Sequence, residues 1–283
     1  MTVDIICPLY NAEKYIKDLH CSILKQENVE IKTIRYVLTK SKDKTEDILK
    51  TLEKCVYNVI EPEEFSHSLT REKEALKSDA DILTFITQDV IIERTNWLEN
   101  LIKPIVCNEA DASFSRQLCN NNSIEKYTRE CNYPNESRIV SDKDIDKLGL
   151  NTFFFSDAAS AIKRETFIKL NAYDGKIFPT NEDMYFAYKL ITNGYKIKYC
   201  ADSEVIHSHN FTLKQQYKRY YDTGKFFKAN DYLNKYKVNK AGSGLALYIL
   251  KRAWQDKNWK VLFNYLPNMA ARFIGMKLGK IRG

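Results

Sequence analysis

Side chains that can bind a metal or move a proton occur in three short clusters of this chain. They are Asp89, the pair Glu182 and Asp183, and the pair His207 and His209. A carboxylate with imidazoles can hold a divalent cation, and a second carboxylate can take a proton from a hydroxyl nucleophile. Together the clusters indicate an enzyme that activates a hydroxyl beside a cation-bound group.

The elements that must position these residues alternate between strand and helix patterns. Strand-like runs cover residues 3–7, 34–38, 55–60 and 82–86, with helical segments between them. This alternation predicts an α/β protein with a mostly parallel, doubly wound sheet. Asp89 follows the fourth run, and His207 and His209 follow a strand-like run over 203–206. Ligand sites of open α/β sheets lie at such carboxyl ends.

The remainder of the chain predicts two further regions. Residues 119–151 are polar and predict an irregular surface excursion, whereas 182–191 predict a helix ended by Asn193-Gly194. Basic, aromatic helices are expected over 213–230 and 245–254, with a last stretch broken at Pro267. We therefore expect a catalytic domain over 1–212, with a nucleotide half of about 1–118 and an acceptor half of about 119–212. A helical extension follows over 213–283.

Composition and charge narrow the function classes. No apolar run approaches the roughly 18 residues that span a bilayer, and no secretory signal is expected. The seven scattered cysteines form no C-x-x-C pair, which favours reduced thiols and argues against zinc. Residues 211–283 carry 16 Lys and Arg against 3 Asp and Glu, whereas residues 1–210 are net acidic. The basic, aromatic tail predicts peripheral contact with an anionic membrane; packing on the body or in a homodimer is the alternative.

Seven motifs in order resemble the inverting family 2 glycosyltransferases, and more narrowly their bacterial rhamnosyltransferase branch. The motifs, spread over residues 2–225, are Ile6-Cys7-Pro8-Leu9-Tyr10-Asn11, Thr70-Arg71, Thr87-Gln88-Asp89, Ser115-Arg116-Gln117-Leu118, Phe155-Ser156-Asp157-Ala158, Asn181-Glu182-Asp183-Met184 and His207-Ser208-His209-Asn210 leading to Lys218–Gly224. The resemblance implies a GT-A fold, dTDP-L-rhamnose as donor, and Mg²⁺ or Mn²⁺ as cofactor. It also implies a lipid-linked cell-surface polysaccharide precursor as acceptor, met at the cytoplasmic membrane face.

The sequence departs from the family pattern at three places. Val37-Leu38-Thr39-Lys40 lacks the acidic residue that usually follows the second strand, and Ser68 and Leu69 replace glycines before the Thr-Arg pair. Thr87 takes the first place of the D-x-D metal motif. A UDP-hexose donor, or a non-catalytic glycan-assembly module with a decayed fold, therefore remains an alternative.

The catalytic and metal residues follow from this chemistry. We predict Asp183 as general base, because one displacement at the anomeric carbon needs a single base; Glu182 binds the acceptor or orients Asp183. Asp89, with His207 or His209, is predicted to hold the cation that neutralises the leaving diphosphate. The alternative is that the two acids only complement a helix dipole and Asp89 only caps a turn.

Further residues are assigned to the two substrates. The predicted donor site comprises Pro8, Tyr10, Asn11, Asp43, Arg71 and Gln88. Stacking of the base on Tyr10 and pairing of Arg71 with the diphosphate are the expected contacts. The predicted acceptor site comprises Arg116, Gln117 and Asp157, although structural salt bridges are an alternative there.

Other nucleotide-dependent functions are disfavoured. Residues 7–12 contain no G-x-G-x-x-G, which excludes a nicotinamide dehydrogenase of the usual kind, and a P-loop is absent. The acidic body would repel phosphates along a nucleic acid, so no nucleic-acid partner is expected.

Overall fold

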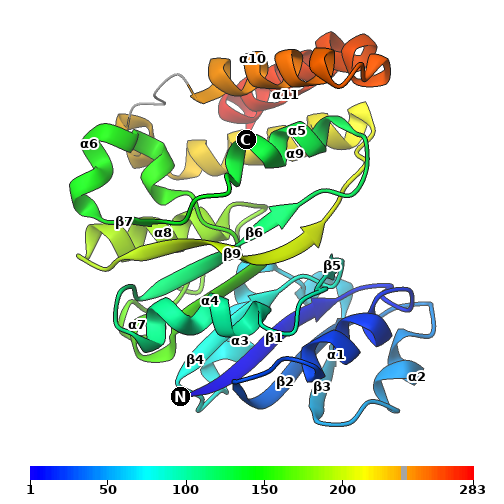
Figure 1. The fold of residues 1–283 in the computed structure, drawn as a ribbon, viewed down its shortest axis with the longest axis vertical. Helices are drawn as coiled ribbons and strands as arrows, with labels where there is room; N and C mark the ends of the chain where they lie inside the picture. Colours follow the sequence, from blue (N-terminus) through cyan, green and yellow to red (C-terminus); the bar gives the residue numbers. More distant parts are fainter. Residues whose placement is uncertain (237–240) are drawn as a thin grey trace.

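A computed structural model describes residues 1–236 and 241–283 (Figure 1). Within these residues the strands form one sheet in the order β3-β2-β1-β4-β8-β6-β9-β5, and β7 pairs with the outside of β9. The strands are β1 Thr2–Leu9, β2 Glu30–Thr39, β3 Cys55–Ile60, β4 Ile82–Ile86, β5 Val90–Ile91, β6 Ala112–Leu118, β7 Arg138–Val140, β8 Ala159–Lys163 and β9 Ile197–His207. The helices are α1 Ile16–Leu24, α2 Thr45–Leu49, α3 His67–Leu76, α4 Trp97–Val106, α5 Ile124–Asn132, α6 Ile145–Leu148, α7 Arg164–Lys169, α8 Glu182–Thr192, α9 Leu213–Ala229, α10 Ala241–Gln255 and α11 Trp259–Arg282.

The N-terminal half is the parallel sheet that the alternating pattern predicts. Strands β3, β2, β1 and β4 all run parallel, with α1 to α3 in the connections. The interior of β1 and all of β4 are buried, which explains why their sequences are continuously apolar rather than alternating. All four carboxyl ends therefore lie at one edge of the sheet.

The second half of the sheet brings distant segments to that edge. β8 runs antiparallel between β4 and β6, and β9 runs parallel to β6. The short β5 then pairs antiparallel with the end of β9, with Val90 opposite His207. This two-residue strand places the turn after β4 beside the carboxyl end of β9.

The prediction that residues 119–151 form an irregular surface excursion is wrong. This region contains α5, β7 and α6, and α5 begins where the Ser123 hydroxyl accepts from the Glu125 amide. The helix buries Tyr127 together with the charged Glu125 and Arg129. Most of its residues are polar and its buried face includes charged side chains, which is why the composition of the region predicts a surface excursion.

The expected break at Pro267 is also wrong, because α11 continues through it. Proline removes the hydrogen bond to the carbonyl four residues earlier, here that of Phe263. Phe263 is 81% exposed, so water can satisfy that carbonyl and the helix persists.

Glycines allow α9 and α11 to pack in parallel at unusually close range. A Cβ added to Gly279 would fall on the Tyr221 carbonyl oxygen, and one added to Gly224 on the Met276 carbonyl oxygen. Gly275 meets the α9 backbone in the same way. With glycine facing inward, the large apolar side chains of α11 are left on its outer face.

Gly279→Ala is expected to lower the free energy of unfolding by at least about 1–3 kcal/mol, because the backbones must separate to admit the methyl group. Thermal and urea unfolding measure the loss. Gly244→Ala is the matched control: nothing lies within 4 Å of that position in α10, so alanine should stabilise the helix by up to about 1 kcal/mol. Equal effects at the two positions would contradict the close packing.

Candidate functional site

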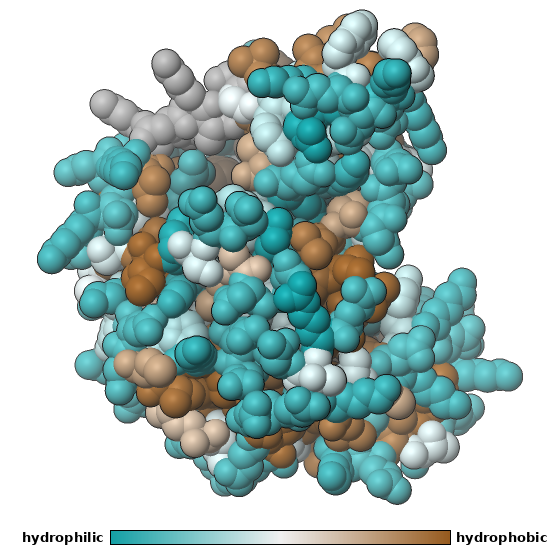
Figure 2. Space-filling view, viewed as in Figure 1, coloured by the Kyte–Doolittle hydropathy of each residue, from teal (hydrophilic) through white to brown (hydrophobic). Residues whose placement is uncertain are grey.

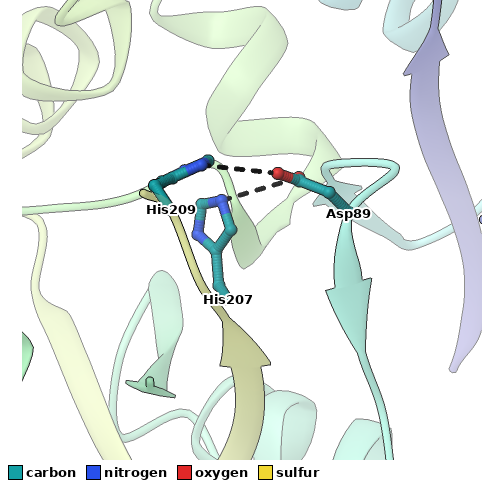
Figure 3. A group of neighbouring side chains, drawn as sticks. All are labelled: Asp89, His207 and His209. Carbon is teal, nitrogen blue, oxygen red and sulfur yellow. Dashed lines mark ion pairs between the residues drawn. The ribbon is translucent and has the colours of Figure 1, made fainter. Parts of the chain in front are cut away.

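Asp89, His207 and His209 meet at the carboxyl edge of the sheet (Figure 3). An Asp89 carboxylate oxygen lies 3.5 Å from His207 Nε2, and the other lies 3.8 Å from His209 Nδ1. One potential ligand atom from each residue lies within 4.8 Å of the others. Figure 3 shows both imidazoles, on β9 and the segment after it, turned toward the Asp89 turn. The structure brings these three side chains together, while their role as metal ligands and the convergence of Asp183 with them stay predictions.

The protonation states of the cluster suit cation binding. Burial opposes ionisation of Asp89, but the hydrogen bond and charge of His207 outweigh it and lower the pKa of Asp89 to about 2. Burial lowers the pKa of His207, and burial with the neighbouring His207 lowers that of His209 to about 3. The cluster therefore offers an ionised carboxylate and neutral imidazoles, a nitrogen and oxygen donor set that can hold a divalent cation.

Gln117 and Arg129 lie behind His207 and orient its ring. Gln117 Oε1 lies 2.9 Å from His207 Nδ1, and Arg129 donates to the same oxygen. A second guanidinium nitrogen of Arg129 lies 3.2 Å from Nδ1. Because an amide oxygen only accepts, Gln117 favours a proton on Nδ1, whereas the Arg129 guanidinium, which only donates, favours a lone pair there. Together the two groups fix the orientation of the ring. The predicted acceptor contact of Gln117 stays a prediction; its amide is buried and serves His207.

Asp183 lines a cavity of about 200 Å³ at the start of α8. Asn181, in the left-handed region at φ 64°, turns the chain into this helix. The Met184 amide donates to Asp183 at 2.7 Å. Burial, with the negative charges of Glu182 and Asp157, raises the pKa of Asp183 well above its ordinary value. A carboxylate with a raised pKa is a stronger base, as proton abstraction requires.

Glu182 points the other way, into a buried charge cluster. Its carboxylate lies 3.2 Å from the Arg71 guanidinium of α3, and both side chains are less than one-tenth exposed. Asp157 is buried nearby, accepting from Tyr173 at 2.6 Å and Ser160 at 2.7 Å. Burial raises the pKa of Asp157 although Arg71 opposes the shift. The arrangement supports an orienting role for Glu182; the donor role of Arg71 and the acceptor role of Asp157 stay predictions.

Arg71→Ala is expected to lower the free energy of unfolding by about 3–5 kcal/mol, because it leaves Glu182 buried without its cation. Urea unfolding measures the loss. The double variant Arg71→Met with Glu182→Leu should recover most of it, since no charge then remains unpaired. Lys50→Met, at the exposed pair with Glu46, is the control and should cost at most about 1 kcal/mol. A similarly small cost for Arg71→Ala would contradict the stabilising role of the buried Arg71–Glu182 pair.

The predicted donor residues gather at the ends of β1 and β4. Gln88 accepts from the Tyr10 amide at 2.7 Å and donates to its carbonyl at 3.0 Å, which ties the Asp89 turn to the loop after β1. Pro8 lies within β1, and the Tyr10 ring is 55% exposed at this edge. The exposed ring is free to stack on a base, as predicted from the sequence.

Asn11 and Asp43 hold neighbouring loops together. The Asn11 amide donates to Ser41 at 2.8 Å, with Asn11 at φ 47°. Asp43 accepts from Thr45 at 2.7 Å and from the Glu13 amide at 3.1 Å. Hydrogen bonds from Thr45 lower its pKa against the effect of burial. These contacts shape the donor edge, while direct contact with a nucleotide stays a prediction for both residues.

Arg116 is the predicted residue that lies apart from the others. Its guanidinium lies 3.0 Å from Glu204, which also pairs with Arg94. Successive residues of a strand face opposite sides, so β6 cannot present both Arg116 and Gln117 to one cavity. The alternative of a structural ion pair accounts for Arg116 in the described residues, and its acceptor role is only a prediction.

Arg129 and Arg219 were missed from the sequence, yet both line the Asp183 cavity. Arg219 also stacks on Phe211, with 5.2 Å to the ring centroid, and Phe211 stacks on His209. Arg129 could have been found from the Ser123 helix cap. Arg219 lies within the Lys218–Gly224 motif, and that motif is the sequence signal that could have identified it.

A further cavity of about 340 Å³ adjoins the cluster and is lined by Asp89, His209, Asn210 and Phe211, among others. Figure 2 shows the surface hollowed on the side where β5 and the loop after β9 lie in Figure 1. Arg129 lines the Asp183 cavity and contacts His207, so one side chain touches both the Asp183 cavity and the cation cluster.

Known proteins resemble this chain in sequence and in fold. The sequence model described as glycosyl transferase family 2 matches residues 4–170. The chain is 31% identical to O-antigen chain rhamnosyltransferase RfbN of Salmonella typhimurium, over 99% of this chain and 90% of RfbN. It is 34% identical to O-antigen chain rhamnosyltransferase WbaN of Salmonella anatum, over 98% of this chain and 88% of WbaN.

The fold resembles the mannosyltransferase PcManGT of Pyrobaculum calidifontis, solved in complex with GDP-Man and Mn²⁺. The TM-score is 0.64 at 15% identity, covering 99% of this chain and 87% of PcManGT. This likeness confirms the predicted GT-A fold. The division at residue 212 stays a prediction.

Proposed function

This chain belongs to glycosyl transferase family 2 and is a glycosyltransferase, and we propose that it moves L-rhamnose from dTDP-L-rhamnose, with inversion, onto a hydroxyl of a lipid-linked polysaccharide precursor. The names of the relatives RfbN and WbaN, O-antigen chain rhamnosyltransferases, support rhamnose as the sugar and a polysaccharide chain as the acceptor. The dTDP donor, the lipid-linked acceptor and the inversion are part of the proposal. The observation that supports the mechanism is Arg129, which lines the Asp183 cavity and contacts His207 of the Asp89, His207 and His209 cluster. We propose that the base and the cation act in one groove.

The proposed reaction is a single displacement. The Asp183 carboxylate accepts the proton of the acceptor hydroxyl, and that oxygen bonds to the anomeric carbon as the bond to the β-phosphate oxygen breaks. A divalent cation held by Asp89, His207 and His209 would neutralise the charge of the departing diphosphate. Arg129 and Gln117 hold the His207 ring in place, and Glu182, paired with Arg71, fixes the start of α8.

Direct assay of donors tests this function. The purified chain is incubated with Mn²⁺, a lipid-linked acceptor extract, and either dTDP-L-rhamnose, UDP-glucose or UDP-N-acetylglucosamine, and product is followed by mass spectrometry. We expect transfer from dTDP-L-rhamnose. Transfer only from a UDP-sugar would replace the proposed donor, and transfer from none, with nucleotide binding also absent in thermal-shift measurements, would support the non-catalytic alternative.

The C-terminal helices are proposed to contact the anionic cytoplasmic face of the membrane that carries the acceptor. No helix in the described part of the chain is long and apolar enough to cross a bilayer. Large apolar side chains of α10 and α11 are nevertheless exposed: Leu247, Trp254, Trp259, Phe263, Leu266 and Phe273. Figure 2 shows hydrophobic surface at the top, where these helices lie in Figure 1. The net positive charge of residues 211–283 complements anionic headgroups around this face.

Phe263→Ser is expected to weaken binding to anionic phosphatidylserine vesicles by roughly tenfold, because it removes a side chain that is 81% exposed on the proposed contact face. Vesicle co-sedimentation measures the change. Ile177→Ser is the control, since Ile177 is 73% exposed but precedes α8 in the catalytic part. Absence of vesicle binding together with a concentration-dependent dimer mass would favour the homodimer alternative.

A further inference from the structure

A third cavity, of about 220 Å³, lies between the C-terminal helices and the catalytic part, beside the Asp183 cavity and the cavity next to Asp89 and His209. Its walls come from the N-terminus of α5, the segment before α9, α9 itself and α11. Five carboxamides line it: Asn122, Asn210, Gln216, Asn264 and Asn268. Amides pair one donor with one acceptor, which matches the adjacent hydroxyls of a sugar.

Two of these amides belong to largely buried residues that are held by Arg272. Asn268 is 6% exposed, and its oxygen accepts from Arg272 at 2.8 Å. Gln216 is 1% exposed and, in the orientation that satisfies Arg272, its oxygen accepts at 2.7 and 3.0 Å. The cavity thus presents fixed amide groups, which can both donate and accept hydrogen bonds as a ligand rich in hydroxyls requires.

The charges of the cavity favour a neutral ligand. Arg272, the buried cation behind the amides, is already paired with Glu125 at 3.1 Å. Lys260 is the remaining charged residue that lines the cavity besides Glu125. Because Glu125 is taken up by Arg272, the surplus is the single charge of the exposed Lys260, which is less than a diphosphate requires. At about 220 Å³ the cavity is smaller than the roughly 300–1,000 Å³ of drug-sized sites and fits a single sugar unit.

This cavity shares lining residues with each of the two cavities of the candidate site. Glu125 lines this cavity and the one that contains Asp183. Asn210 and Phe211 line this cavity and the one beside Asp89 and His209. A glycan with its reactive hydroxyl at Asp183 can therefore extend toward the C-terminal helices.

Resting on the proposed function, we propose that this carboxamide cavity is a subsite for a neutral sugar unit of the acceptor glycan, away from the unit that receives the new sugar. It gives the C-terminal helices a part in acceptor selection, because α11 supplies Asn264 and Asn268. The subsite distinguishes longer acceptors from single sugars.

Ligand-observed NMR with a panel of neutral trisaccharides of hexoses and 6-deoxyhexoses tests the subsite, in the presence of saturating dTDP and Mn²⁺. At least one trisaccharide should bind, and the double variant Asn122→Ala with Asn264→Ala should bind it roughly tenfold more weakly, because hydrogen bonds are lost. Both residues are exposed at the rim, so the fold should be unaffected. Asn268→Ala is the second variant, and Gln255→Ala on α10 is the control.

Three results would overturn the subsite: no trisaccharide binds, dTDP with Mn²⁺ displaces it, or the double variant binds it as well as the parent chain. Thermal shift by dTDP and Mn²⁺ on the same samples reports the proposed function separately. Trisaccharide binding without any nucleotide shift would retain the glycan subsite and reject the transferase proposal.

Discussion

Asp183→Asn protein is expected to transfer sugar about 10²–10⁴ times more slowly than the parent chain while binding the donor with similar affinity. An amide keeps the shape of the carboxyl group and can still accept from the Met184 amide, but it cannot take a proton. Initial rates with saturating donor measure the first effect, and calorimetric titration with dTDP and Mn²⁺ measures the second. Near-normal turnover would refute the assignment of the base.

The same substitution is expected to raise the melting temperature at neutral pH, by about 3 °C for each kcal/mol gained. The pKa of Asp183 is raised by burial and by its acidic neighbours, so the folded chain binds this proton more tightly than the unfolded chain. Stability therefore falls as the pH rises from the ordinary aspartate pKa through the raised value, and the neutral amide avoids this loss. At low pH, where Asp183 is protonated in both states, the advantage should vanish.

Asp146→Asn is the matched control for both measurements. Asp146 also stands in the first turn of a helix, but it is exposed and lies outside the described cavities. We expect unchanged transfer and a melting temperature within experimental error. A parent-like stability at Asp183→Asn would mean that the carboxylate is better solvated than its surroundings indicate.

The strands and the residues at the carboxyl edge of the sheet were predicted well, because each of them is revealed by a pattern within one short segment. Buried parallel strands are continuous apolar runs, so β4 was predicted with the bounds that the structure gives. The bounds of the partly exposed edge strand β3 were predicted equally well. The residues after them carry the chemistry in any fold of this class. His207 and His209, two residues apart at a strand end, were likewise recognisable by spacing alone.

What the sequence did not predict depends on contacts between distant segments. The two-residue β5, which seats Asp89 beside His207, is too short to carry a periodic signal. Arg129 reaches His207 from α5, a helix whose buried face contains Glu125 and Arg129 themselves. Such buried polar residues are stable only with their partners in place, and no single segment reveals the partner.

The C-terminal helices show a different reason for failure. Proline and glycine in α11 suggest interruption when they are taken as local signals. In the folded chain Gly275 and Gly279 are the residues that admit α9, and Pro267 loses a hydrogen bond only where water can replace it. The same inward glycines leave the aromatic side chains on the outer face.

Asp89→Ala is expected to weaken Mn²⁺-dependent dTDP binding by at least about 10–100-fold, because it removes the only anionic ligand of the cluster. Two neutral imidazoles alone leave the cation's charge uncompensated beside the diphosphate. Calorimetric titrations of dTDP, in Mn²⁺ and in chelator, separate the metal-dependent part of the affinity from the rest. Asp79→Ala, at an exposed aspartate paired with Lys32, is the control.

Substitutions in and around the cluster are expected to weaken metal-dependent dTDP binding to different degrees. Gln117→Leu should weaken the metal-dependent affinity by about tenfold, less than Asp89→Ala, because the His207 ring loses its Gln117 partner at Nδ1 but remains present. His207→Ala should fall between the two or match Asp89→Ala. Identical titration curves for all three variants and the parent would remove the cluster from the donor site. A loss that persists in chelator would instead assign these residues to direct contact with the nucleotide, because a role through the cation requires the cation to be present.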